Sequence, residues 1–363
     1  MKKEFIKCLQ AYLKGEKLNK IEDDKDLINL AIEQSLQTIL YPVYNDKSYK
    51  KYYIGWVVKQ EEFLSIQKEI TDIFNTNNIN HLYFKGSVLC NLYDDPSIRT
   101  RGDIDVYVGY DNLDKAKKIL LSNGYELDHG DNLHHINFKK NNINVEVHFS
   151  LFDEEVSKKW VNYFSNPFDL ATQVDKNKYI LDDTNHFIYC LCHFAKHLRQ
   201  GAGIRYILDF YYMLEKTTIN FDLLHSFLNE LDLIRLYEYT LGVIYYLIEK
   251  KYDNFDIPDC QFFVDYLFES GIHGNDCSKD RSGTGIVEGN KFKYIMSRLF
   301  LTNKQYRKAI YPKLGAHWYL YSLCIIVHWF HLITPGFLHK VKTLFNIIFR
   351  KNNKKELYKK LGI

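Results

Sequence analysis

Apolar side chains recur every three to four positions through most of the first 80 residues, with polar and charged residues between them. This spacing places the apolar side chains on one face of a helix. It predicts three helices, over residues 5–18, 27–40 and 61–74.

After residue 80 the apolar period shortens, which is typical of strands. A continuous apolar and aromatic run predicts a buried strand over residues 81–84. A short helical segment is expected at 88–93, and a second strand at 103–108. An amphipathic helix over 112–123 follows, and Gly124 fits its C-cap.

Two later runs, residues 133–139 and 143–149, alternate apolar and polar positions, and a short strand is expected before them at 125–127. Asn141 and Asn142 fit a tight turn between the runs, so we predict a β-hairpin. Strands interspersed with helices predict a small mixed β-sheet backed by helices.

From about residue 153 onward the pattern predicts helices only, over residues 183–199, 204–214, 221–231, 234–250 and 262–269. The expected fold class is therefore α+β, with a sheet-containing domain followed by an α-helical domain. We expect an N-terminal helical lead-in at 1–59, the sheet-containing domain at 60–152 and the helical domain at 153–363.

Composition and charge narrow the possible classes of protein but do not identify a function. The 363 residues fit two domains better than one, and a hydrophobic fraction of 46% is enough to bury a core. A net charge of +3 creates no global field that would attract nucleic acid. The first 20 residues lack the apolar run of a secretory signal. Seven scattered cysteines without metal-site spacing favour reduced thiols, so a cytoplasmic protein is expected.

The strongest candidate chemistry lies between the first two strands of the predicted sheet. On a strand, Asp103 and Asp105 point to the same side, where two carboxylates repel each other unless a positive group lies between them. A divalent cation with oxygen ligands is the usual solution, and Mg²⁺ also favours phosphate oxygens. The upstream turn, Lys85 with Gly86 and Ser87, fits close approach of a phosphate.

Arg99 and Arg101 add positive charge that suits a polyphosphate. Glu146 and His148 share one face of the second hairpin arm. This arrangement is also what an ordinary half-buried strand would show. If the hairpin lies beside the Asp103–Asp105 strand, however, Glu146 completes a three-carboxylate metal site. A carboxylate suits Mg²⁺ better than an imidazole does, which assigns a supporting role to His148.

The order Lys-Gly-Ser, Arg, Asp-Ile-Asp and then Glu-x-His resembles the DNA polymerase β-type nucleotidyltransferase superfamily, and in particular its bacterial nucleotidyltransferase-like proteins. The spacing between Ser87 and Asp103 is longer than in the minimal pattern. The resemblance implies transfer of a nucleoside monophosphate from an NTP to an acceptor, with Mg²⁺ or Mn²⁺ as cofactor. It implies that Asp103, Asp105 and Glu146 are catalytic metal ligands in a catalytic domain at 60–152.

The same resemblance extends to the segment with His193, Lys196 and His197 followed by Arg205 and Asp209. The two histidines are four apart, so three interpretations stay open: a zinc clamp, buried hydrogen-bonded histidines, or a basic cluster that faces the substrate. Arg205 and Asp209 are also four apart, and the simplest prediction is an ordinary ion pair along one helix.

Two C-terminal features have no assigned chemistry. Residues 271–290 are rich in glycine but lack a phosphate-loop motif, so a loop is expected there. Residues 314–339 contain no charged side chain and many aromatic ones. A buried helical pair, an interfacial membrane contact and a membrane span all fit this stretch, and a basic amphipathic segment follows it. Segment 314–349 is therefore a candidate contact for a membrane or a lipid-linked substrate.

The acceptor is left open by the sequence. A small molecule, a sugar or polysaccharide precursor and a peptide product are all compatible with the site. The alternatives are a toxin-type nucleotidyltransferase that modifies a nucleic acid such as tRNA, and a non-catalytic nucleotide-binding protein. The near-neutral charge gives no strong nucleic-acid signal, and the intact acidic residues disfavour a non-catalytic protein.

Overall fold

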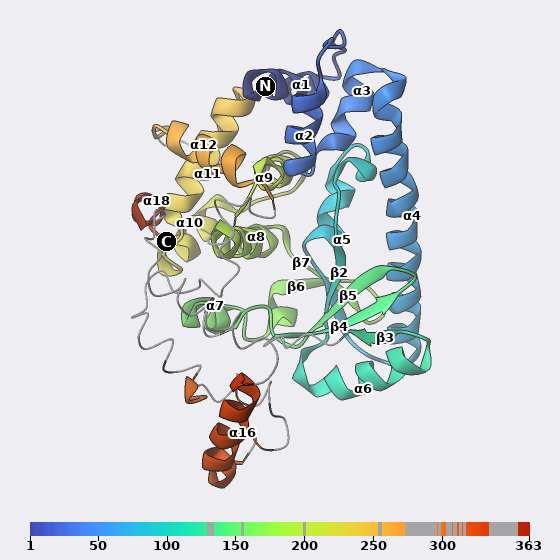
Figure 1. The fold of residues 1–363 in the computed structure, drawn as a ribbon, viewed down its shortest axis with the longest axis vertical. Coiled ribbons are helices and arrows are strands. Elements are labelled where there is room, and N and C mark those ends of the chain that lie inside the picture. The colour runs from blue at the N-terminus through green and yellow to red at the C-terminus, as the bar shows by residue number, and fades with distance from the viewer. Residues whose placement is uncertain are drawn as a thin grey trace.

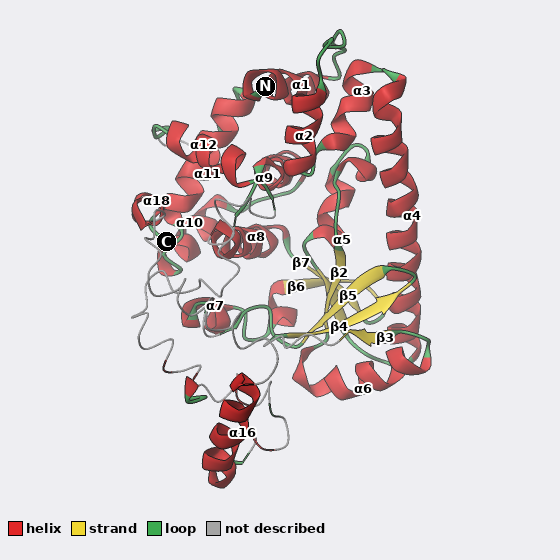
Figure 2. Ribbon diagram, viewed as in Figure 1, coloured by secondary structure: helices red, strands yellow, loops and turns green. Residues whose placement is uncertain are grey.

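The computed structural model describes residues 1–128, 134–153, 156–198, 201–252, 256–272, 296, 299–302, 307, 311, 314, 317–333 and 355–363. Figures 1 and 2 show a seven-stranded mixed β-sheet with helices packed around it. The α+β fold class predicted from the sequence is confirmed.

The sheet has the strand order β3-β4-β5-β2-β1-β7-β6. The strands are β1 (His81–Tyr83), β2 (Asp103–Tyr107), β3 (Glu126–Asp128), β4 (His135–Lys140), β5 (Ile143–His148), β6 (Ala171–Asp175) and β7 (Lys178–Leu181). Strands β2 and β5 are parallel, as are β1 and β7, and the other neighbours are antiparallel. The predicted hairpin is β4 with β5, and Asn141 and Asn142 at its turn both have positive φ.

Strands β6 and β7 correct the expectation that only helices follow residue 153. They form a hairpin, and β7 pairs in parallel with β1 through the register Leu82↔Tyr179. Lys178–Leu181 contains Tyr179 and Ile180, which favour strands. Their strand state depends on pairing with β1, which lies almost a hundred residues away, so local periodicity alone misses it.

Helices precede and flank the first part of the sheet. They are α1 (Lys2–Lys14), α2 (Lys25–Glu33), α3 (Leu40–Tyr44), α4 (Lys47–Thr76), α5 (Gly86–Leu89), α6 (Gly109–Ser122) and α7 (Lys158–Tyr163), with 3₁₀ turns at Gln37–Ile39, Cys90–Leu92, Pro96–Ile98 and Pro167–Leu170. Helix α4 has 30 residues, twice the predicted length, because Asp46 caps it well upstream by accepting the amide of Ser48.

One face of the sheet packs on α4 and α6 (Figure 1). Ile104 and Val106 of β2 and Val145 of β5 are buried there. Phe63 and Phe74 of α4 complete the same core. Because strand residues alternate faces, burial of these side chains sends Asp103, Asp105 and Glu146 to the opposite side.

The opposite side faces a helical region. Its elements are α8 (Asp183–Leu198), α9 (Ile204–Lys216), α10 (Phe221–Glu230), α11 (Ile234–Ile248), α12 (Gln261–Ser270) and α18 (Lys355–Leu361). Helices α1 and α2 share their hydrophobic core through Phe5 and Leu27. Helix α8 lies beside the sheet (Figure 2) and contacts β7.

The C-terminal predictions are only partly covered by the described residues. Residues 273–290, most of the expected loop, and all of 334–354 lie outside them. Within them, a 3₁₀ turn at Trp318–Leu320 leads into α16 (Tyr321–Ile333). Across the described part of the chain, no helix has both the length and the apolar character that a membrane crossing requires.

Candidate active site

The pairing of three strands brings the predicted site together. In the parallel β2–β5 pair, Asp105 lies directly opposite Glu146. In the antiparallel β4–β5 hairpin, His135 lies opposite His148. Directly opposed residues share one face of a sheet, so carboxylates and imidazoles form adjoining rows. The condition set by the sequence, that the hairpin lies beside the Asp103–Asp105 strand, is met because the second hairpin arm, β5, pairs with β2.

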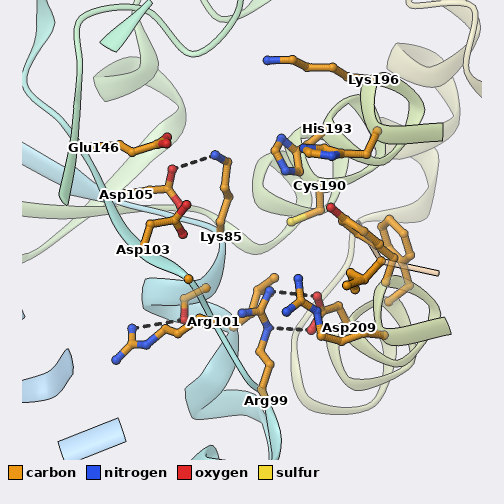
Figure 3. Close-up of a pocket in the computed structure, with 18 of the residues that line it drawn as sticks. Lys85, Arg99, Arg101, Asp103, Asp105, Glu146, Cys190, His193, Lys196 and Asp209 are labelled. Carbon is orange, nitrogen blue, oxygen red and sulfur yellow. Dashed lines mark hydrogen bonds and ion pairs between the residues drawn. The ribbon is translucent and has the colours of Figure 1, made fainter. Parts of the chain in front are cut away.

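The ammonium group of a lysine balances negative charge of the carboxylates in this structure. Lys85 Nζ lies 2.6 Å from Asp105 Oδ1, and the two side chains are 17% and 1% exposed. Figure 3 shows Lys85 reaching from the end of β1 toward Asp105, with Glu146 and Asp103 on either side. Lys85 was predicted as a phosphate ligand; in this structure its ammonium group is paired with the candidate metal ligand.

The backbone of Lys85 is in an unfavourable conformation. Its φ of 49° and ψ of −132° lie in a region that non-glycine residues rarely occupy. Its amide donates to His186 Nε2 at 3.2 Å, and burial lowers the pKa of His186 to about 4, so the ring is a neutral acceptor at pH 7. Such strain costs about 1–3 kcal/mol. The surrounding contacts therefore hold Lys85 in a position that serves the site.

Asp105 and Glu146 are held in the ionised form. Burial acts to raise the pKa of Asp105, but the Lys85 ammonium and a hydrogen bond from His148 outweigh burial and lower it. For Glu146, burial is likewise outweighed by the hydrogen bond from His148 and by Lys85, so its pKa falls below the usual range. Ionised carboxylates are the form that a hard cation requires.

Asp103 behaves differently from its neighbours. Burial, together with the nearby charge of Asp105, raises the pKa of Asp103 to about 7. Asp103 pairs with Asn144 in the β2–β5 register, two positions before the pair of Asp105 with Glu146. Ionising Asp103 therefore costs free energy at neutral pH unless further positive charge enters the site.

His148 supports the carboxylates directly. Its Nε2 lies 3.0 Å from Asp105 Oδ1 and 3.2 Å from Glu146 Oε2, and the side chain is buried. This geometry matches the predicted role of orienting a carboxylate and differs from a strand-edge histidine bonded to backbone.

The carboxylates form one wall of a cavity of about 600 Å³. The opposite wall comes from α8 and α9 and carries His193, Lys196, His197 and Arg205. Burial lowers the pKa of Lys196, which has no hydrogen-bond partner among the described residues. Figure 3 shows Lys196 and His193 on the far side of the cavity from Glu146. Acidic and basic walls facing each other suit a cation and a phosphate bound together.

The zinc interpretation of His193 and His197 gains no support. Their ring centroids are 4.3 Å apart, yet neither residue belongs to a group of three metal-ligating side chains in the described ranges. Burial lowers the pKa of both rings, that of His197 to about 3, so both are neutral at pH 7.

The expected helical ion pair between Arg205 and Asp209 is wrong. Asp209 instead accepts from Arg99, whose Nε and Nη2 lie 2.7 and 2.9 Å from its two carboxylate oxygens. The Tyr93 hydroxyl also donates to Asp209 at 2.7 Å. Arg205 donates to the carbonyl oxygen of Thr100 at 2.7 Å. The bidentate fork of a buried arginine gives a better partner than an i,i+4 neighbour does.

The other predicted phosphate ligands occupy different places. Arg101 also borders the cavity, but its guanidinium stacks on Phe63 with 4.5 Å between the guanidinium carbon and the ring centroid. Ser87 is buried outside the cavity lining, and its hydroxyl has no hydrogen-bond partner among the described residues. Their roles in nucleotide binding stay predictions.

Gly86 is closely packed against the side chain of Arg99. A Cβ at Gly86 would lie 2.8 Å from Arg99 Nη1, and Arg99 is anchored to Asp209. We expect Gly86→Ala to lower the free energy of unfolding by about 1–2 kcal/mol, because overpacking forces the anchored side chain to move. Gly102, also at the cavity but with open space around its Cβ position, is the matched control. Urea unfolding of both alanine variants makes the comparison, and equal losses would contradict it.

Two residues at the site were missed from the sequence. His134 and His135 border the same cavity, and His135 Nε2 lies 3.5 Å from Glu146 Oε1. Counting back from the hairpin turn would have placed His135 opposite His148, so the signal was present in the register.

Comparison with known proteins gives one result. A family model described as uncharacterised nucleotidyltransferase matches residues 22–248, more than half of the chain. No curated protein and no solved structure gives a significant match. The matched range includes every strand of the described sheet and all of the cavity-lining residues except Ile272.

Proposed function

Because the chain belongs to the uncharacterised nucleotidyltransferase family, we propose that it is a metal-dependent enzyme that transfers a nucleoside monophosphate from an NTP to an acceptor. Pyrophosphate is the second product. The proposal includes a place among the bacterial members of the DNA polymerase β-type superfamily. The sequence order of Lys85-Gly86-Ser87, the two aspartates and Glu146 supports that placement.

One observation carries the proposal. The β2–β5 register places Asp105 beside Glu146, with Asp103 next to them on the same strand face, opposite a basic cavity wall. Three carboxylates facing lysine and histidine side chains suit a cation on one side and a phosphate chain on the other.

Asp103, Asp105 and Glu146 would hold Mg²⁺ or Mn²⁺. The fit rests on their chemistry: all are oxygen ligands, Asp105 and Glu146 are held ionised, and Lys85 already occupies the position of a positive charge between them. When bound, the metal supplies neutralisation of phosphate charge and alignment of the attacking and leaving oxygens.

The remaining roles belong to the chain itself. An acceptor oxygen attacks the α-phosphorus, its proton passes to a base for which Glu146 is the candidate, and the bond to pyrophosphate breaks. Lys85, Gly86, Ser87, Arg99 and Arg101 are assigned to the nucleotide. All of these except Ser87 line the cavity, and Lys85 contacts Asp105 directly.

The helical wall is assigned to the remaining substrate contacts. Lys196, whose ammonium group lies at the cavity without a hydrogen-bond partner among the described residues, is the strongest candidate for a phosphate contact there. His193, His197 and Arg205 are assigned to the substrate or acceptor, and Asp209 holds Arg99 in place. This assignment makes residues 153–363 the source of one half of the substrate site, in line with the expected accessory domain.

Glu146 and His148 should separate in kinetics. We expect Glu146→Gln to lower the rate at saturating NTP on the order of 10³-fold or more at every accessible pH, because a metal ligand and candidate base is lost. His148→Ala should cost far less and should mainly raise the acceptor KM or alter the pH profile. Steady-state rates with both substrates varied distinguish them. If His148→Ala abolished the activity and Glu146→Gln left the rate unchanged, the assignment would be refuted.

The acceptor can be found by following the transferred group. The protein is incubated with each α-labelled NTP, Mg²⁺ and cell extract, with the Asp103→Asn variant as the blank. Label in a small molecule, a sugar precursor or a peptide fits the proposal, and label in RNA supports the toxin-type alternative. Failure of the wild type to release pyrophosphate from any NTP would overturn the transfer reaction.

A cytoplasmic location and a peripheral lipid contact complete the proposal. The six cysteines among the described residues are free and buried, which supports a reducing compartment. Trp318, Tyr319 and Phe330 are 84%, 63% and 69% exposed. Exposed aromatic rings of this kind support contact of segment 314–349 with a membrane surface or a lipid-linked acceptor.

A further inference from the structure

Three histidines gather next to the carboxylates. One ring nitrogen from each of His134, His135 and His148 lies within 4.8 Å of the others. The ring centroids of His134 and His135 are 4.6 Å apart, and those of His135 and His148 are 4.8 Å apart. Residues His135 and His148 are cross-strand partners, and His134 is the residue just before β4, so the sheet itself fixes the cluster.

The cluster contains buried polar atoms without a hydrogen bond. The Nδ1 atoms of all three rings are buried and have no hydrogen-bond partner among the described residues. His135 and His148 are 8% and 1% exposed. A buried polar atom left without a hydrogen bond is destabilising, so three in one place require an explanation such as a bound ion.

Each imidazole can offer one nitrogen lone pair to a metal ion. The buried Nδ1 atoms, which have no hydrogen-bond partner among the described residues, are available for that role. Oxygen ligands lie nearby, because Glu146 Oε1 is 3.5 Å from His135 Nε2 and Asp153 Oδ2 is 3.8 Å from His134 Nδ1.

We propose that His134, His135 and His148 form a second cation position, selective for a divalent transition metal ion such as Zn²⁺ or Co²⁺, beside the three-carboxylate position. Imidazole nitrogens bind these ions well and bind Mg²⁺ poorly. The position goes beyond the transfer reaction and shares with it only His148, which also belongs to the group with Asp105 and Glu146. Occupation of one position therefore changes the ligands available to the other.

The test measures metal binding without nucleotide, so it is independent of activity. The full-length protein is stripped with EDTA and titrated with Co²⁺, whose visible absorption reports nitrogen ligation, and then with Zn²⁺ as competitor. We expect the wild type to bind one Co²⁺ that Zn²⁺ displaces and excess Mg²⁺ does not. His134→Gln/His135→Gln should lower the Co²⁺ affinity by ~100-fold or more, since losing direct ligands exceeds the 10–100-fold typical of outer-shell changes.

The matched control is His193→Gln/His197→Gln, a second close histidine pair on the same cavity that belongs to no three-ligand group within the described ranges. It should retain the Co²⁺ absorption. Absence of a Co²⁺ band in the wild type, or an equal loss in both double variants, would overturn the proposal. Thermal melting checks folding, and the single His134→Gln variant, at the most accessible of the three rings, provides the comparison if the double variant is unstable.

The same titration separates this position from the transfer site. NTP binding in the presence of Mg²⁺ is measured on His134→Gln/His135→Gln. If the variant retains NTP binding and loses Co²⁺ binding, the cation position and the NTP site are distinct, as proposed. If Co²⁺ binding is intact in the wild type while no NTP binds, the cation position stands and the transfer reaction fails.

Discussion

Asp105→Asn is expected to abolish nucleotidyl transfer and to lower the free energy of unfolding by about 3 kcal/mol. The activity is lost because Asp105 is the best buried of the candidate metal ligands and contacts both Lys85 and His148. The stability loss follows from Lys85, whose ammonium would stay largely buried without its carboxylate. An uncompensated buried charge costs several kcal/mol, more than a lost neutral hydrogen bond.

Asp103→Asn is the matched comparison. It should abolish transfer equally but leave stability unchanged or raise it by about 1 kcal/mol at pH 7. The pKa of Asp103 is raised from 3.8 to about 7 in the folded protein, so its protonated form stabilises the fold at low pH. That stabilisation is lost as the pH rises from about 3.8 to about 7. An asparagine does not titrate, so the stability of the variant should rise relative to that of the wild type across this pH interval.

Urea unfolding at pH 5 and pH 7.5, together with pyrophosphate release, measures both variants. The two substitutions change the same atoms on the same strand, so any difference in stability reports the local charges. Equal destabilisation of both variants would show that Lys85 does not depend on Asp105. Near-normal turnover in either variant would remove it from the metal site.

Breaking the Arg99–Asp209 pair is expected to destabilise the fold strongly. Both side chains are about 95% buried and joined by two hydrogen bonds. Arg99→Met and Asp209→Leu should each lower the free energy of unfolding by about 3–5 kcal/mol, because each leaves one buried charge without its partner. The double variant should recover most of that loss, since two apolar side chains then replace two charges.

A double-mutant cycle by chemical denaturation measures this coupling. The surface pair Lys216–Asp94, with a 3.0 Å contact and side chains 47% and 73% exposed, is the control. Lys216→Met should cost less than about 1 kcal/mol. Additive losses in the Arg99 and Asp209 variants would mean that the pair contributes nothing beyond its separate side chains.

The carboxylate site was predictable from the sequence because its residues are related by spacing along two strands. Alternation places Asp103 with Asp105, and Glu146 with His148, and the hairpin needs only a short turn to reach the next strand. The partner of Asp209 was not predictable in this way. Arg99 lies 110 positions away, so the helical spacing favoured Arg205, and only the packed fold brings Arg99 to it. Strand β7 was missed for the same reason, since its parallel partner β1 lies almost a hundred residues earlier, and β6 joins the sheet only by pairing with β7.

The position of Lys85 also affects how substrates enter. Its ammonium group is already the counter-ion of Asp105 inside the protein. If the proposed metal position is correct, a divalent ion that binds Asp105 would compete with this ammonium group. An NTP that arrives with its cation would supply phosphate oxygens for the displaced ammonium group, so metal and triphosphate are expected to bind cooperatively.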